Sequence, residues 1–133
     1  MTIRRVTSPT VAEPPPERWS NCLVCDGIAY VSGMTARGTD AAALGKMDEY
    51  EQSKVIFDKI KGMVEAAGGK MADVVKITVY VTKIQNNTKV WAARREYFTG
   101  NFPASTLVEV SALAAPEILV EIEAIAHIGK GPR

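Results

Sequence analysis

Cys22 and Cys25 form a Cys-x-x-Cys pair, a spacing that occurs in thiol–disulfide redox sites and as one half of a zinc site. The segment that carries them, Cys-Leu-Val-Cys, is typical of a β-strand, and side chains three positions apart on a strand point to opposite faces. The sequence has no second Cys-x-x-Cys, and His127 is its single histidine. We therefore interpret the two cysteines as structural and expect no metal site.

A second group of reactive side chains lies in segment 118–127, where two carboxylates alternate with apolar residues. One face of the predicted strand is apolar and consists of Val120, Ile122, Ala124 and Ala126. The other face consists of Leu119, Glu121, Glu123, Ile125 and His127. Because apolar residues stand at both ends of this second face, we expect that it is not simply washed by water.

Hydrophobic periodicity predicts an α+β fold in which two helices cover one face of a sheet of about six strands. The strands are expected at residues 21–25, 28–32, 74–82, 106–112 and 118–127, and the helices at residues 48–67 and 88–99. An Asp-Gly pair predicts a tight turn after the first strand, and residues 32–46 are predicted to be a loop. In the strand at 74–82, the apolar face is expected to consist of Val75, Ile77, Val79 and Val81.

Length and composition indicate one domain over residues 1–133, with an extended lead-in at 1–18 and a flexible tail at 129–133. Three consecutive prolines, residues 14–16, stiffen the lead-in. The net charge is +1, without a basic block, which argues against a nucleic-acid partner. No apolar run has the length of a signal peptide core or a membrane span, so we expect a cytoplasmic protein without a membrane partner.

Several short motifs, spread in order over residues 19–128, together resemble the Rid family of reactive intermediate deaminases, also called the YjgF family. They are Tyr-Val-Ser-Gly at 30–33, Glu-Gln-Ser at 51–53, Ala-Ala-Gly at 66–68, DVVKITVYV at 73–81, Phe-Pro-Ala at 102–104 and VEIEAIA at 120–126. The resemblance implies a chorismate-mutase-like fold and a homotrimeric barrel with ligand pockets between subunits. It also implies hydrolysis of enamines or imines to 2-keto acids and ammonia, without a metal or an organic cofactor.

The resemblance assigns the catalytic role to Glu121, which would position or activate the attacking water. It places the substrate contacts at Trp19, Ser32, Met34, Trp91, Ser105, Thr106 and Leu107. Several of these differ from the family pattern. Met34 replaces a glutamine, and Leu107 replaces a cysteine. Trp19 aligns with a tyrosine and Trp91 with an asparagine.

Ser105 is the most consequential difference, because the family has an arginine there that binds the substrate carboxylate. A serine hydroxyl offers one hydrogen-bond donor where a guanidinium offers five, so a pocket with Ser105 should hold a 2-imino acid poorly. Arg37, Arg94 or Arg95 could supply a substitute cation, although the charged face of the helix that carries the last two is expected to be solvated. The two tryptophans favour flat or aromatic ligands.

Two functions from different classes follow from these residues. One is a divergent hydrolase of a reactive enamine or imine. The other is a trimer that binds a small hydrophobic or aromatic metabolite without turning it over. In a structural interpretation, Trp19 and Trp91 pack an interface and Glu121 is a buried group of the trimer interior. An endoribonuclease, a third activity named in the family, receives little support from the near-zero net charge.

Overall fold

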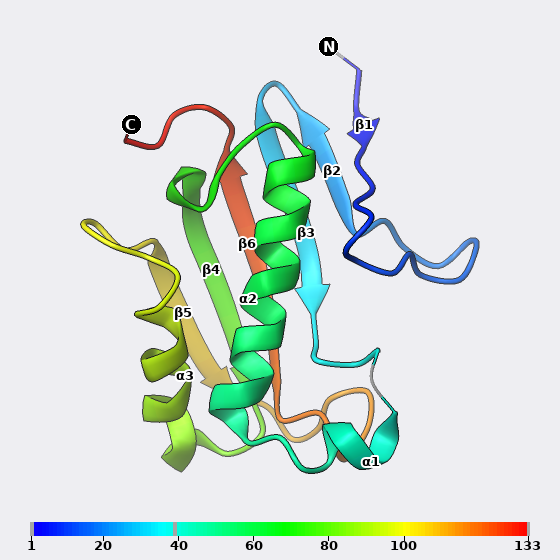
Figure 1. The fold of residues 1–133 in the computed structure, drawn as a ribbon, viewed down its shortest axis with the longest axis vertical. Coiled ribbons are helices and arrows are strands. Elements are labelled where there is room, and N and C mark those ends of the chain that lie inside the picture. The colour runs from blue at the N-terminus through cyan, green and yellow to red at the C-terminus, as the bar shows by residue number, and fades with distance from the viewer. Residues whose placement is uncertain (1, 39, 133) are drawn as a thin grey trace.

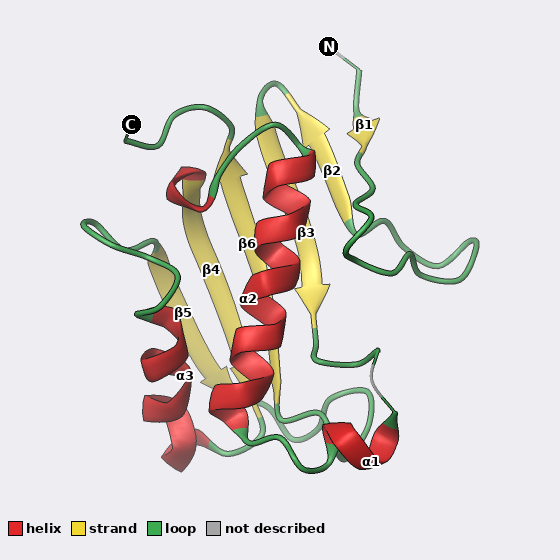
Figure 2. Ribbon diagram, in the orientation of Figure 1, coloured by secondary structure: helices red, strands yellow, loops and turns green. Residues whose placement is uncertain are grey.

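Alternating apolar residues build one mixed sheet, and the computed structural model describes it for residues 2–38 and 40–132 (Figures 1 and 2). The strands are β1 (Arg4–Arg5), β2 (Cys22–Cys25), β3 (Ile28–Met34), β4 (Val74–Val81), β5 (Ala104–Glu109) and β6 (Val120–His127). The helices are α1 (Ala41–Leu44), α2 (Glu49–Ala66) and α3 (Asn87–Arg94), with short 3-10 helices η1 (Met71–Asp73) and η2 (Ile84–Asn86). The predicted six-stranded α+β fold is confirmed.

The last strand in the sequence lies in the middle of the sheet. The strand order is β1-β2-β3-β6-β4-β5, so that β6 pairs with both β3 and β4. The β4–β5 pair is parallel, whereas the other neighbours are antiparallel. A central strand is hydrogen-bonded along both edges, and its side chains are therefore fixed more firmly than those of an edge strand.

Helices α2 and α3 lie on one face of the sheet, with α2 across its middle and α3 beside β5 (Figure 1). Asp48 begins α2 with a capping box, accepting a hydrogen bond from the backbone N–H of Glu51. Gly68, with φ of 97°, follows the helix in the left-handed conformation that an apolar L-residue avoids. The predicted apolar stripe of this helix is buried at Ile56, Ile60, Met63, Val64 and Ala67.

Helix α3 is shorter than predicted and ends at Arg94, not at residue 99. The aromatic residues that follow it account for the early end. Tyr97 and Phe98 turn inward and place their rings 5.2 and 5.8 Å from the ring of Phe57. In addition, the Tyr97 hydroxyl donates to the carboxylate of Asp58 at 2.8 Å, which anchors the chain against α2.

Two β-bulges change which side chains face the core. In β4, Val74 pairs with Ala126 and Lys76 with Ile125, so one extra residue is inserted between them. As a result Val75, which regular alternation places in the core, is 43% exposed. The prediction for this residue was wrong, because a bulge leaves no trace in a two-residue repeat.

The bulge in β3 lies between Val31, which pairs with Ala124, and Met34, which pairs with Ile122. Two residues of β3, Ser32 and Gly33, therefore stand opposite a single residue of β6. Strand β3 also continues to residue 34, where the sequence predicted a loop from residue 32.

The two ends of the chain are held more firmly than their composition suggests. In the expected lead-in 1–18, β1 pairs with β2, and Val6 and Val11 are buried in the core. In the expected flexible tail 129–133, the backbone N–H groups of Gly129 and Gly131 donate to the buried carboxylate of Asp73 at 2.9 and 2.7 Å. Polar anchoring of a tail by a distant carboxylate cannot be recognised from sequence spacing.

Within residues 2–38 and 40–132, none of the helices combines the length and apolar character that a bilayer crossing requires.

Candidate functional site

Glu121 lies on the face of the sheet opposite α2 and α3, in the central strand β6, where it pairs with Tyr80 of β4. Its side chain is half-buried and lies over the α-carbon of Gly33 in β3. Burial raises the pKa of Glu121 above its ordinary value, and the nearby charge of Glu123 raises it further. A carboxylate in this environment is a stronger base near neutral pH than an exposed one.

The two glutamates of β6 differ in their partners. Glu123 accepts a hydrogen bond from the Tyr80 hydroxyl at 3.1 Å. Among the described residues, Glu121 neither accepts a hydrogen bond nor lies within 4 Å of a cationic nitrogen. Since a buried carboxylate normally has a partner, Glu121 is available to a ligand or to water.

Ser32 belongs to the same region, in the bulge of β3 that faces β6. Its Oγ is buried, and among the described residues it has no hydrogen-bond partner. A hydroxyl both donates and accepts, so Ser32 has unused hydrogen-bonding capacity in the strand that neighbours Glu121. Thr106 of β5 shares this face, but its Oγ1 already accepts a hydrogen bond from Lys76 at 2.7 Å.

Trp19 lies at a second place, where it lines a cavity of about 550 Å³ between the N-terminal segment and α2. The indole is 52% exposed, and its Nε1 donates to the side chain of Asn21 at 3.3 Å. Met34 also borders this cavity but is only 5% exposed and packs in the hydrophobic core. The bulge of β3 turns Met34 toward the helices, so its side chain points away from the face that carries Glu121.

Lys59 of α2 closes one wall of the same cavity. Its ammonium group donates to the backbone oxygens of Thr35 and Arg37 at 2.7 and 2.5 Å. Burial lowers the pKa of Lys59. These bonds tie the end of β3 to the helix and hold the chain that borders the cavity.

Ser105 lies at a third place, on the helix-covered face of the sheet. It pairs with Ile77, which is fully buried beneath the helices. Leu107 follows two positions later on the same face and packs against the core. Trp91 of α3 is 40% exposed, and Arg94, one turn later, donates from Nη1 to Ser105 Oγ at 3.0 Å.

The predicted site residues therefore form three groups within one subunit. Glu121, Ser32 and Thr106 share the helix-free face, Trp19 and Met34 border the cavity beside α2, and the remaining group is Trp91, Ser105 and Leu107. Ser105 and Glu121 stand on opposite faces of the sheet, so one subunit does not bring them together. The sequence did not predict that the Glu121 side chain occupies the space over Gly33, a space that we call the niche. Its only signal in the sequence is a glycine beside a serine in a strand.

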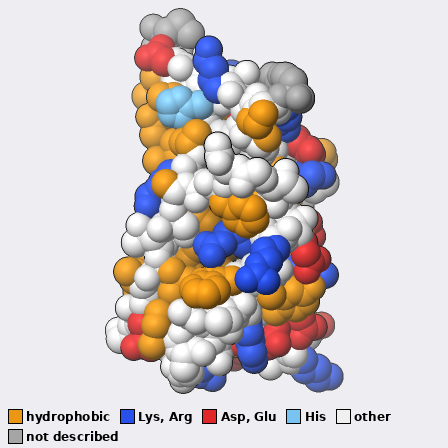
Figure 3. Space-filling view, turned by 90° about the vertical axis from the view of Figure 1, so that its left-hand side faces the viewer, with side chains coloured by type: hydrophobic (Ala, Val, Ile, Leu, Met, Phe, Trp, Pro, Cys, Tyr) orange, Lys and Arg blue, Asp and Glu red, His pale blue; other side chains and the backbone are white. Residues whose placement is uncertain are grey.

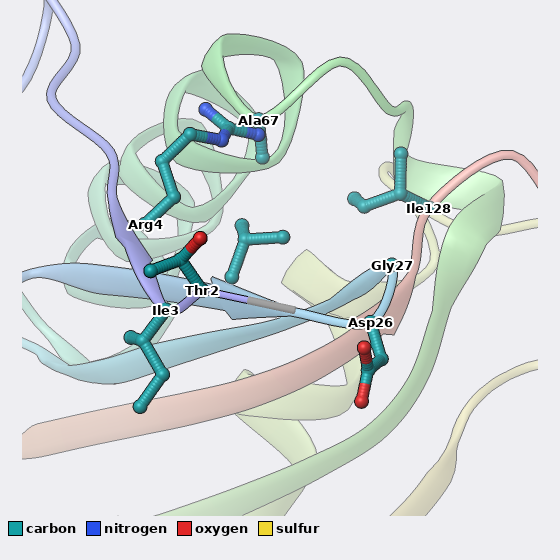
Figure 4. A pocket seen from close by; sticks show the side chains of 8 residues that line it. Thr2, Ile3, Arg4, Asp26, Gly27, Ala67 and Ile128 are labelled. Atoms are coloured by element: carbon teal, nitrogen blue, oxygen red, sulfur yellow. The ribbon is translucent and has the colours of Figure 1, made fainter.

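The remaining surfaces add no candidate of comparable chemistry. A cavity of about 610 Å³ lies at the C-terminal end of α2, where Figure 4 shows Arg4 extending toward Ala67 while Asp26 points away from Ala67. The free cysteines point to opposite faces of β2, as predicted, and burial raises the pKa of Cys22. Among the described residues, no three His, Cys, Asp or Glu side chains gather where a metal ion would fit.

Comparison with known proteins places the chain in a family. The family model described as endoribonuclease L-PSP matches residues 10–128. A crystal structure of a protein of unknown function from Pseudomonas aeruginosa is 39% identical, with a TM-score of 0.91, and the match covers 98% of this chain and 95% of that one.

Two further solved structures carry family names. A member of the YjgF/YER057c/UK114 family from Mycobacterium tuberculosis is 32% identical over 83% of this chain and 86% of that one, with a TM-score of 0.72. A protein of the conserved Rid family from Yersinia pestis is 30% identical over 96% of this chain and the whole of that one, with a TM-score of 0.83. The match to the family model and the likeness to these structures agree with the resemblance found in the sequence motifs, and the chain therefore belongs to the Rid family, also called the YjgF family.

Proposed function

We propose that this protein is a Rid-type hydrolase that converts an enamine or imine of a small reactive metabolite into a carbonyl compound and ammonia, in the cytoplasm. The observation that carries the proposal is the side chain of Glu121. It is half-buried, its pKa is raised by burial, and no described residue satisfies it. An unpartnered carboxylate of this kind is suited to general acid–base catalysis.

The chemistry asks for one proton-transferring group. The substrate reacts as the protonated imine. The carboxylate of Glu121 takes a proton from water as the water oxygen bonds to the imine carbon, and the electron pair of the C=N double bond moves to nitrogen, which gives a neutral carbinolamine. The proton held by Glu121 then passes to this nitrogen, and ammonia leaves with the C–N electron pair as the carbinolamine oxygen forms the carbonyl. Glu121 takes the proton that the oxygen loses and returns it to the released ammonia as ammonium. The Ser32 hydroxyl, beside the same strand, can orient the attacking water.

We propose further that the working form is a homotrimer and that the substrate binds between subunits. The helix-free face carries exposed apolar side chains, among them Leu23, Tyr30 and Val108. Exposed apolar residues on a sheet face favour coverage by another subunit. A neighbouring copy would also allow the face with Ser105 to approach the face with Glu121, which a single chain keeps apart. Sedimentation should give the mass of three chains, and a monomer would contradict the shared site.

The proposal is tested by following ammonia release from imines generated in situ from aliphatic, aromatic and amide-bearing amino acids. The wild-type protein should accelerate release from at least one of them, and Glu121→Gln should reduce that rate about 10²- to 10⁴-fold. Glu123→Gln is the matched control, because it makes the same charge change on the same face of β6. Equal losses in both variants, or no acceleration by the wild type, would contradict the assignment.

A second candidate function is binding without turnover. It is favoured by the exposure of both indoles, 52% at Trp19 and 40% at Trp91, because exposed tryptophans often mark contact surfaces for apolar ligands. Titration of tryptophan fluorescence with a panel of aromatic metabolites distinguishes the two functions. Saturable quenching without ammonia release from any imine would favour the binder. An endoribonuclease is the least supported activity, because the net charge is only +1.

A further inference from the structure

A cationic side chain of α3 contacts β5. Arg94 is in the last turn of α3, and its Nη1 donates to Ser105 Oγ of β5 at 3.0 Å. Figure 3 views the molecule from this side and shows basic side chains in the middle of the face, with hydrophobic side chains above and below them. The hydrogen bond therefore holds the guanidinium against the strand.

No acidic group neutralises this cation. Within the described residues, no carboxylate oxygen lies within 4 Å of Arg94. Burial lowers the pKa of Arg94, and the adjacent positive charge of Arg95 lowers it further. A partly desolvated guanidinium that has only a neutral hydroxyl as partner is an unfavourable arrangement, and a bound anion would relieve it.

An exposed aromatic side chain accompanies the cation. Trp91 stands three positions before Arg94 on α3, a spacing that places the two side chains on neighbouring parts of one helix face. A ligand that pairs with the guanidinium would thus find a flat apolar surface nearby.

We propose that Arg94, held in place by Ser105, binds the carboxylate of the ligand, and that Trp91 contacts an apolar or aromatic group attached to it. The ligand class is therefore a carboxylate with a flat apolar substituent, such as an aromatic 2-imino or 2-keto acid. This inference rests on the proposed function for the identity of the site and names its substrate class. It assigns the contact with the carboxylate to Arg94 of α3, because residue 105 of β5 is a serine and carries no positive charge.

The hydrogen bond between Arg94 and Ser105 defines the proposed role of Ser105, which is to orient the guanidinium. Its Oγ accepts one N–H of the guanidinium, which leaves the other donors of the planar fork for a carboxylate. An arginine at position 105 would begin at the strand position that Arg94 contacts, so we expect it to supply a guanidinium to the same region. Ser105→Arg should therefore compensate for the loss of Arg94.

Binding is measured by isothermal titration calorimetry with phenylpyruvate and with its uncharged methyl ester, so that no turnover is needed. The wild-type protein should bind phenylpyruvate more tightly than the ester. Arg94→Gln should weaken the binding of phenylpyruvate about ten- to a hundredfold, which is the range expected for charge-assisted hydrogen bonds. The affinity for the ester should not change. Arg95→Gln is the matched control, because it removes the same charge from the next residue, and it should change binding less than about threefold.

Two further variants keep the test decisive if Arg94→Gln folds poorly. Arg94→Lys retains the charge without the planar fork and should bind phenylpyruvate with intermediate affinity. In the double variant Arg94→Gln/Ser105→Arg, affinity for phenylpyruvate should return to within about threefold of wild type. Equal weakening by Arg94→Gln and Arg95→Gln would overturn the inference. Failure of the wild-type protein to bind phenylpyruvate at millimolar concentrations would also overturn it.

The outcome is separable from that of the proposed hydrolase. A protein that binds phenylpyruvate through Arg94 but releases no ammonia from any imine retains the anion site and loses the enzymatic assignment. A protein that hydrolyses charged and neutral imines at equal rates, with or without Arg94, retains the enzymatic assignment and loses the anion site.

Discussion

The carboxylate of Glu121 occupies the space where Gly33 has no side chain. A Cβ at position 33 would lie 2.1 Å from Glu121 Oε2 and 2.8 Å from its carboxyl carbon. Because Gly33 has no side chain, the carboxylate of Glu121 can lie against this position of β3. The niche exists because the bulge of β3 brings a glycine, and not a larger residue, against the central strand.

Gly33→Ala should displace the carboxylate without unfolding the protein. The overlapping atoms are the far end of a flexible side chain, which can rotate away, so the melting temperature should change little. Hydrolysis of a responsive imine should fall about a hundredfold, as expected when a catalytic group is misplaced by about 1 Å. In a Glu121→Ala background the same change should have no further effect. Full activity in Gly33→Ala would show that the niche does not position the catalytic group.

The raised pKa of Glu121 predicts the acid side of the pH–rate profile. The carboxylate must be ionised to act as a base, so activity should be lost as the pH falls through a pKa that lies above the ordinary value of 4.5. Burial is the main cause of the shift and the charge of Glu123 adds to it. In Glu123→Gln the midpoint should therefore move to lower pH without a loss of the plateau rate, and an unchanged midpoint would exclude coupling between the two carboxylates.

The same pKa shift affects stability with a definite sign. Because the folded-state pKa of Glu121 is above the unfolded value, its contribution is fully present below the unfolded pKa and is lost as the pH rises through the folded pKa. Glu121→Gln should thus be more stable than wild type at pH 7, and the difference should shrink toward pH 4. Urea unfolding at both pH values, at one protein concentration, measures it. A difference that does not vary with pH would contradict the linkage.

Gln52 connects α2 to the segment that leads into β6. It is fully buried, its Oε1 accepts from the Leu119 N–H at 2.9 Å, and its Nε2 donates to the backbone oxygens of Glu117 and Met47 at 2.8 and 3.3 Å. Gln52→Leu leaves these backbone groups without partners and should reduce the free energy of unfolding by about 2 to 3 kcal/mol. Glu65→Gln, at an exposed position of the same helix, should change it by less than about 0.5 kcal/mol.

Asp73 should determine how firmly the C-terminal residues are held. Its buried carboxylate accepts from the backbone N–H groups of Lys70, Gly129 and Gly131. Asp73→Ala should cost about 3 kcal/mol and accelerate amide hydrogen exchange at residues 129 and 131. Asp73→Asn keeps one acceptor oxygen and should retain part of the protection. Unchanged exchange in Asp73→Ala would mean that other contacts hold the tail.

Most of the fold prediction came from regular hydrophobic periodicity in the sequence. The stripe of α2 and the alternation of β6 follow from elements that keep one periodicity throughout, because each such residue repeats the environment of its neighbours. The order of the strands and the parallel pairing of β5 followed from no repeat in the sequence, since they depend on contacts between distant segments.

The errors lie where periodicity is interrupted. The bulge at Val75 exposed a valine that alternation placed in the core, and the bulge at Ser32 and Gly33 turned Met34 into the core. Arg94 illustrates a different limit. Its position on a polar helix face predicted solvation, whereas a contact with Ser105, eleven residues away, decides its place. Such a contact depends on tertiary geometry that no local pattern encodes.

The extra residue of β3 has one more consequence. Val31 and Met34 face the core on either side of it, and they would continue to do so if either intervening residue were removed, because ordinary alternation would then join them. A deletion there would straighten the strand, keep the interior intact and abolish the recess for the acid. Loss of one codon would thus remove the place that the Glu121 side chain occupies while the core residues on either side keep their orientation.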